Sequence, residues 1–183
     1  MFRQIFQFLN LISLKDLPKA KDHYLDIEVI KHYQAISQDG LFPDELETLD
    51  FWKNSNVENV LIVGAGAGRE AQVFSNYCQN VICFEPSPKM YEGLNLHSKI
   101  KFISSLNHLD TMFDIIFVSA FVLNFMTHKE RNEFYDLAHG HLKKSYGVCS
   151  SRYYGINNPS KFQVFYCITF FKNKIFKFRN SKR

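Results

Sequence analysis

The stretch that decides the fold is Val60-Leu61-Ile62-Val63-Gly64-Ala65-Gly66-Ala67-Gly68, an apolar run that ends in three glycines at alternate positions. A short continuous apolar run is typical of a strand buried on both faces of a parallel sheet. Glycine suits the positions after it, because the chain turns sharply there and a ligand can approach the backbone closely. Residues 69–79 then have apolar side chains at helical spacing. The segment therefore predicts a strand, a ligand-binding turn and a helix.

The alternation of strand and helix continues downstream of the glycines. Further strands are predicted at residues 81–84, 100–103, 114–119 and 146–151. Ser87-Pro88 provides an N-cap and a first-turn proline for a helix through Leu94. Thr127-His128-Lys129-Glu130 has the form of a capping box and predicts another helix behind it. This alternation predicts a doubly wound, mostly parallel Rossmann-like α/β sheet.

The N-terminal third has a helical pattern without strands. Apolar residues recur at helical spacing over residues 2–12 and 27–36, and Asp39-Gly40 ends the second of these stripes. A third helix can begin at Pro43, where a missing N–H costs nothing, and run toward Trp52. Residues 1–55 are therefore expected to form a helical extension that covers the site.

The C-terminal section is different again. Two β-branched and aromatic runs, at residues 162–171 and 175–178, flank Lys172-Asn173-Lys174 and predict an antiparallel hairpin that closes the sheet edge. No repeat or linker divides the chain. We therefore expect a single domain over residues 1–183, with a helical cap at 1–55 and a Rossmann-like core at 56–183.

Composition excludes several classes of protein. The 183 residues are 46% hydrophobic, which suits one globular domain and excludes a disordered, collagenous or disulfide-framework protein. The four cysteines include no C-x-x-C pair and are expected to be reduced. Gln4, Gln7 and Asn10 interrupt the apolar N-terminus, and no stretch approaches the roughly 20 apolar residues that a bilayer span needs. We expect no membrane span and a cytoplasmic location.

Charge is distributed unevenly along the chain. Residues 1–136 carry all 18 acidic residues, whereas residues 137–183 carry ten basic residues and no acidic one. The basic, aromatic-rich C-terminal segment can bind the phosphates and stack the bases of a nucleic acid. The alternation in Lys174-Ile175-Phe176-Lys177-Phe178 is equally typical of an edge strand whose lysines discourage pairing with another sheet, and we favour this second interpretation.

The spacing of the glycines indicates which nucleotide the turn binds. A turn that binds a pyrophosphate has the pattern G-x-G-x-x-G, but counting from Gly64 the third glycine of that pattern falls on Arg69. The observed pattern is G-x-G-x-G. Glu85 follows Gly64 by 21 residues, at the end of the next predicted strand, where a carboxylate can accept hydrogen bonds from both hydroxyls of a ribose.

This pattern resembles motif I of the class I S-adenosylmethionine-dependent methyltransferases. The resemblance extends from about Val60 to Ser151 and includes Phe84-Glu85-Pro86-Ser87, Phe113-Asp114-Ile115-Ile116 and the turn at residues 142–147. Tyr33, the segment Gly40-Leu41-Phe42-Pro43-Asp44-Glu45 and Gly68-Arg69-Glu70-Ala71 also look like a group of bacterial methyltransferases of undefined substrate.

The resemblance implies S-adenosylmethionine as the cofactor and a set of residues around it. The glycine turn would pass under the methionine and ribose, Glu85 would bind the ribose hydroxyls, and Ser119 would face the methionine end. Ile62 stands where such enzymes often have an acidic residue, so Glu70 is the candidate partner for the cofactor's amino group. The predicted cofactor-binding residues are Gly64, Ala65, Gly66, Gly68, Glu70, Glu85, Pro86, Ser105, Leu106, Asn107 and Ser119.

The expected function is methyl transfer to an unidentified small-molecule acceptor. Ser119-Ala120-Phe121-Val122 differs from the N/D-P-P-Y motif that holds a base or amide amine, which disfavours adenine or glutamine as the acceptor. His128 and Tyr33 are candidates for a base that removes the acceptor's proton, and the catalytic residue stays open. No metal site is expected. The alternative is an inactive S-adenosylmethionine-binding module, or an RNA- or partner-binding module, on the same fold.

Overall fold

The computed structural model describes residues 24–42, 45–46, 49, 53, 56–107, 109–119, 122–143 and 148–150, and four two-residue strands farther along the chain. The helix predicted over residues 2–12 lies outside the described residues, as do Pro43 at the start of the third predicted helix and Ala120 after the fourth strand.

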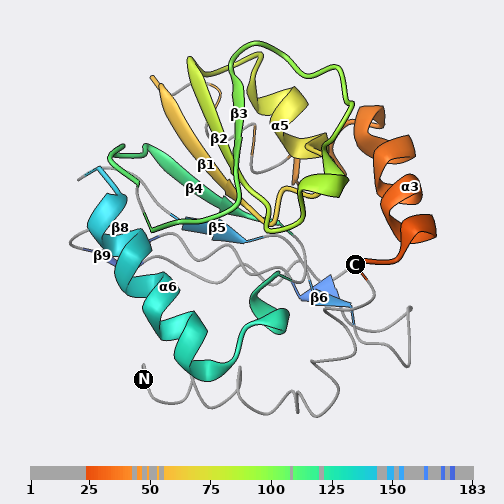
Figure 1. The fold of residues 1–183 in the computed structure, drawn as a ribbon. Coiled ribbons are helices and arrows are strands. Elements are labelled where there is room, and N and C mark those ends of the chain that lie inside the picture. The colour runs from red at the N-terminus through yellow and green to blue at the C-terminus, as the bar shows by residue number, and fades with distance from the viewer. Residues whose placement is uncertain are drawn as a thin grey trace.

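The centre of the fold is a five-stranded parallel sheet with strand order β3-β2-β1-β4-β5 (Figure 1). Its strands occupy the segments that the apolar runs predict: β1 Asn59–Val63, β2 Asn80–Phe84, β3 Ile100–Ile103, β4 Ile115–Val118 and β5 Val148–Ser150. The chain builds the sheet outward from β1 on one side and then returns to add β4 and β5 on the other. The topological switch point therefore lies between β1 and β4, where ligands bind at the carboxyl ends of such sheets.

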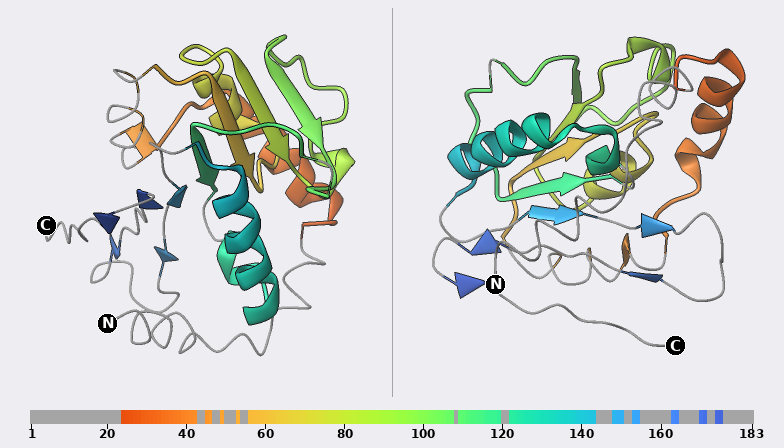
Figure 2. Two further views of the ribbon diagram at one scale, coloured as in Figure 1. Left: turned by 90° about the vertical axis from the view of Figure 1, so that its left-hand side faces the viewer. Right: turned by 90° about the horizontal axis from the view of Figure 1, so that it is seen from below.

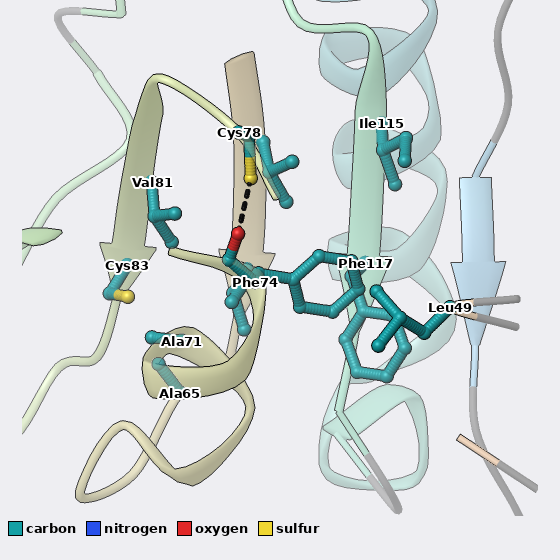
Figure 3. Close-up of a cluster of buried hydrophobic side chains, with 11 residues drawn as sticks. Leu49, Ala65, Ala71, Phe74, Cys78, Val81, Cys83, Ile115 and Phe117 are labelled. Carbon is teal, nitrogen blue, oxygen red and sulfur yellow. Dashed lines mark hydrogen bonds between the residues drawn. The ribbon is translucent and has the colours of Figure 1, made fainter. Parts of the chain in front are cut away.

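Alternate side chains of the central strands enter two separate cores. Val60 and Ile62 of β1 belong to a cluster that also contains Phe74 of helix α5 (Arg69–Phe74). Phe74 contacts Phe117 of β4, with ring centroids 5.4 Å apart (Figure 3). Leu61 and Val63 belong to the other cluster, with side chains of helix α6 (His128–His141). The two helices thus cover opposite faces of the sheet, which is the predicted doubly wound Rossmann-like arrangement.

Thr127 and Glu130 form the predicted capping box at the start of α6. Two other predicted helices are shorter than expected. α5 ends at Phe74 instead of Gln79, and the ammonium of Lys99 satisfies the freed carbonyls of Ser75 and Cys78 at 3.0 Å each. The helix predicted from Ser87 through Leu94 was wrong: only the 3-10 turn η2 (Pro88–Met90) forms. Gly93 follows at φ 75°, a conformation that a right-handed helix cannot contain.

The N-terminal segment contains helix α3 (Ile27–Ala35) and the 3-10 turn η1 (Ile36–Gln38). The Asp26 side chain caps α3 by accepting a hydrogen bond from the Glu28 amide. Two views show α3 beside η2 (Figures 1 and 2). Of the third predicted helix, the described residues show two helical hydrogen bonds, from Leu46 N to Phe42 O and from Lys53 N to Leu49 O.

Beyond β5, two antiparallel pairs are described, each a sheet of its own. They are β6 (Tyr153–Tyr154) with β7 (Gln163–Val164), and β8 (Phe170–Phe171) with β9 (Lys174–Ile175). β8 and β9 fall on the predicted hairpin, but most of that hairpin lies outside the described residues, so its closure of the sheet edge stays a prediction. Among the described residues, no helix combines the length and the apolar character that crossing a membrane requires.

Candidate functional site

The turn after β1 is held in place by the end of β2. The amides of Gly64 and Ala65 both donate hydrogen bonds to the carbonyl of Phe84, and the Gly68 amide donates to the carbonyl of Ala65. Gly64, Gly66 and Gly68 have φ angles of 74°, 53° and 81°. Because L-residues with side chains rarely adopt these angles, the backbone itself requires the three glycines of the motif.

Each of the three glycines also faces a side chain from a different segment. A Cβ atom added to Gly64 would collide with Val122, which follows β4. At Gly66 the nearest atom to an added Cβ is Cδ1 of Tyr33 in α3, at 3.8 Å, and at Gly68 it is Cζ of Phe102 in β3, at 3.2 Å. The sequence pattern predicts a ligand's close approach to these glycines, but at Gly64 packing within the chain also requires glycine, and at Gly68 an added Cβ would crowd Phe102.

The carboxylate of Glu85 lies against the glycine turn. Its Oε2 accepts a hydrogen bond from the Gly66 amide at 3.0 Å, and its Oε1 accepts one from the Ser87 amide at 3.0 Å. Burial raises the pKa of Glu85, and these two hydrogen bonds act in the opposite direction. Each carboxylate oxygen has a second lone pair, so Glu85 can still accept a hydrogen bond at each oxygen from a diol.

An aromatic side chain of α3 lies against this turn, with two further rings packed beside it. The Tyr33 ring faces Gly66, and the Tyr24 ring lies 5.8 Å from the Tyr33 ring and 5.2 Å from the ring of Phe125. Burial, followed by interaction with Tyr33, raises the pKa of Tyr24, so its phenol stays neutral. Tyr33 thus lies beside the glycine turn, and its role as a base stays a prediction. Tyr24 and Phe125 are neighbours of this ring that the sequence pattern did not indicate.

Ser119 follows β4, and its amide donates a hydrogen bond to the Val63 carbonyl next to Gly64. In the described part of the chain, Ser119 Oγ is the one buried side-chain polar atom without a hydrogen-bond partner. An unsatisfied buried hydroxyl costs stability, so its presence at the carboxyl edge of the sheet is typical of a functional site.

The predicted adenine-side residues follow the neighbouring strands. Leu106 packs against the α6-side core, and the Ser105 hydroxyl accepts a hydrogen bond from the Asn107 amide at 3.2 Å. Pro86 and Asn107 are exposed. The structure thus places these residues after β2 and β3, at the same edge of the sheet as the glycine turn.

Glu70 and His128 have other contacts. Glu70 is buried and accepts a hydrogen bond from Arg69 at 2.9 Å. Its predicted contact with the cofactor's amino group stays a prediction, and that contact would compete with the hydrogen bond from Arg69. His128 is exposed at the start of α6, and its Nδ1 lies 3.2 Å from Nδ2 of Asn132. These contacts give neither residue a place against the glycine turn.

The residues present fit S-adenosylmethionine. They provide a glycine turn without side chains at Gly64, Gly66 and Gly68, a buried carboxylate with free acceptor capacity beside it, and an unpartnered hydroxyl after the adjacent strand. The described residues contain no group of three or more histidine, cysteine or acidic side chains that could hold a metal ion.

Comparison with known proteins also points to a methyltransferase. A family model described as a methyltransferase domain matches residues 61–147. No curated protein sequence matches the chain.

Three solved structures illustrate the fold similarity. The N-methyltransferase NodS from Bradyrhizobium japonicum WM9 is 17% identical with a TM-score of 0.50, and the alignment covers 61% of this chain and 69% of NodS. The glycopeptide N-methyltransferase MtfA, complexed with S-adenosylmethionine, is 17% identical with a TM-score of 0.53, over 62% of this chain and 55% of MtfA. CalS10 from Micromonospora echinaspora, an amino pentose methyltransferase, is 17% identical with a TM-score of 0.52, over 64% of this chain and 51% of CalS10.

The alignments with MtfA and CalS10 span little more than half of those enzymes' length. At these identities the structural likeness establishes the fold alone. The fold is a doubly wound, Rossmann-like α/β fold whose topological switch point lies between β1 and β4. Residues 61–147 match the model of a methyltransferase domain, which is consistent with the class I S-adenosylmethionine-dependent methyltransferases.

Proposed function

We propose that the protein transfers the methyl group of S-adenosylmethionine to a small-molecule acceptor. The observation that carries this proposal is the buried Glu85 carboxylate bonded to the Gly66 amide, with Tyr33 over the same glycine. The methyltransferase family of residues 61–147 supports it. MtfA is described as a glycopeptide methyltransferase and CalS10 as an amino pentose methyltransferase, and we propose an acceptor in this range of size.

In this proposal the two ends of the cofactor are held by different strands. Gly64, Ala65, Gly66 and Gly68 pass beneath its methionine and ribose, and Glu85 accepts hydrogen bonds from the ribose hydroxyls. The segments after β2 and β3 border the adenine, through Pro86, Ser105, Leu106 and Asn107. Ser119 faces the methionine end, where its unpartnered hydroxyl can donate a hydrogen bond.

The reaction requires little chemistry from the protein itself. The sulfonium of S-adenosylmethionine supplies an activated methyl group, so the chain must orient the acceptor, exclude water and provide a path for a proton. The aromatic cluster of Tyr24, Tyr33 and Phe125 lies at the position to do the first two tasks. We also propose that residues 1–55 form the cap over this site as part of a single domain.

The test is turnover. The protein is incubated with S-adenosylmethionine and a panel of small amines, phenols, thiols and carboxylic acids, with RNA as a separate arm, and S-adenosylhomocysteine is measured. We expect its formation with at least one small acceptor and its loss in Glu85→Ala, whereas Glu92→Ala, an exposed carboxylate after η2, leaves it unchanged. Turnover with RNA alone contradicts the small-molecule assignment, and cofactor binding without any turnover favours the inactive module.

A further inference from the structure

One buried cation connects the N-terminal segment to the glycine turn. Arg69, the first residue of α5, directly follows Gly68 and is 9% exposed. Its Nη1 donates to the carbonyl of Gly40 at 2.7 Å and to Oε2 of Glu45 at 2.8 Å. Its Nη2 donates to Oε1 of Glu45 at 2.9 Å and to Oε1 of Glu70 at 2.9 Å.

The contact with Glu45 is bidentate, and Glu45 is 1% exposed. The Phe42 ring adds a cation–π contact, with its centroid 4.1 Å from Cζ of Arg69. Thus three residues of the segment 40–45 contact one guanidinium. Only arginine can donate to this set of acceptors at once, because lysine has a single nitrogen.

The same N-terminal segment contacts the proposed cofactor site through α3. Tyr33 lies over Gly66, and Nε2 of Gln34 donates to the carbonyls of Lys89 and Met90 in η2, at 3.0 and 3.4 Å. η1 follows α3 directly and leads to Gly40. Arg69 therefore contacts the C-terminal part of this segment, at Gly40, Phe42 and Glu45, while α3 within the segment contacts the glycine turn and η2.

We propose that Arg69 is a positioning residue, which seats the segment 24–45 on the domain so that Tyr33 covers Gly66, and thereby sets the affinity for S-adenosylmethionine. The proposal rests on the proposed function for its ligand, but the seating of the segment is independent of it. Arg69 acts on the site through α3 and through the turn that it follows, and makes no catalytic contact.

The experiment compares the full chain with Arg69→Lys. Hydrogen exchange measured by mass spectrometry reports the seating of α3, and calorimetry with S-adenosylhomocysteine reports affinity well below each protein's Tm. We expect faster exchange of the α3 amides with β1 and β4 still protected, and an affinity lower by about tenfold, as for loss of a group that supports contacting residues.

The matched control is Lys143→Met. Lys143 pairs with Asp114 at 2.9 Å and with Glu58 at 3.3 Å, at the opposite end of β1 and β4. This substitution also removes a charge network, so it is expected to lower Tm while leaving α3 exchange and affinity unchanged. If the control lowers the affinity as much as Arg69→Lys does, the effect is general destabilisation and the proposal is overturned.

Two further results decide the proposal. If Arg69→Lys does not fold, Glu45→Gln is used in its place, because glutamine still offers one acceptor to Arg69. Faster exchange of the α3 amides and a lower affinity for S-adenosylhomocysteine are again expected, but both effects should be smaller. Unchanged α3 exchange, or unchanged affinity despite faster exchange, overturns the proposal. If the unmodified chain does not bind S-adenosylhomocysteine, the proposed function and the affinity part fail together, and the exchange data still show whether Arg69 seats α3.

Discussion

The Glu85 carboxylate accepts a hydrogen bond from the Gly66 amide at 3.0 Å, which joins the end of β2 to the turn after β1. The same carboxylate accepts a hydrogen bond from the Ser87 amide. Glu85 therefore shapes the turn before any ligand is present and keeps acceptor capacity for one. A role in positioning the turn and a role in ribose binding reinforce each other in this geometry.

Replacing Glu85 by Ala should weaken S-adenosylhomocysteine binding by roughly 1 to 3 kcal/mol, the range for hydrogen bonds to a charged group. Isothermal titration calorimetry measures this change. Glu92→Ala removes an exposed carboxylate nearby and should leave the affinity unchanged. Equal affinities of the two variants would mean that Glu85 does not contact the ribose.

Two glycines with similar positive φ angles, Gly64 in the turn and Gly93 after η2, should differ in their sensitivity to alanine. Gly93 has φ 75° with no atom within 4 Å of an added Cβ. Gly93→Ala should therefore lower the free energy of unfolding only by the strain of a left-handed alanine, about 1 to 2 kcal/mol. Gly64 has a similar φ of 74°, but its added Cβ collides with Val122, so Gly64→Ala should cost about 1 to 3 kcal/mol more. Urea unfolding measures both variants, and equal losses would contradict the packing of Val122 on Gly64.

Ser119→Ala should separate stability from function. The substitution removes a buried hydroxyl without a partner, so the free energy of unfolding should stay constant or rise by about 1 kcal/mol. If the hydroxyl serves the cofactor, the affinity for S-adenosylhomocysteine should fall. A loss of stability would show that Ser119 Oγ has a partner in the folded protein.

Stability should depend on pH through Glu70. Burial raises the pKa of Glu70 to about 7, and Arg69 opposes that shift. Between the unfolded-state pKa, about 4.3, and the folded-state value, the folded protein binds the proton more tightly, so stability falls as pH rises through this window. Glu70→Gln removes the titration and should make the protein more stable than the unmodified chain above pH 7, by up to about 4 kcal/mol.

Urea unfolding of both proteins between about pH 5 and pH 8 tests this dependence. The difference in stability between Glu70→Gln and the unmodified chain should grow as pH rises and level off above pH 7. Parallel pH profiles would show that Glu70 keeps its ordinary pKa.

The sheet could be predicted from the sequence because its signals are local. Each of the five strands is an apolar run, and the alternation of strand and helix indicates that they are parallel. The capping box of Thr127 and Glu130 likewise lies within four residues. The early end of α5 could not be predicted from local pattern, since the carbonyls after it are bonded by Lys99, which lies 24 residues after Ser75.

In the candidate site, too, some contacts could be predicted from the sequence and others could not. Gly66 and Glu85 could be paired from spacing, because consecutive parallel strands bring their carboxyl ends together. The contact between Arg69 and Glu45 could not, because 24 residues separate them and the fold alone brings them together. Both segments resemble the same group of methyltransferases, but nothing in their sequence pattern indicated that they bind each other.

We expect the turn at Gly64–Gly68, together with Glu85, to bind S-adenosylmethionine. Calorimetric titration of the full chain with S-adenosylmethionine and S-adenosylhomocysteine tests this binding most directly. We expect one site per chain with a Kd well below 1 mM for both ligands, which corresponds to a binding free energy more favourable than about −4 kcal/mol. Absence of binding by either ligand at about millimolar concentration would contradict this expectation.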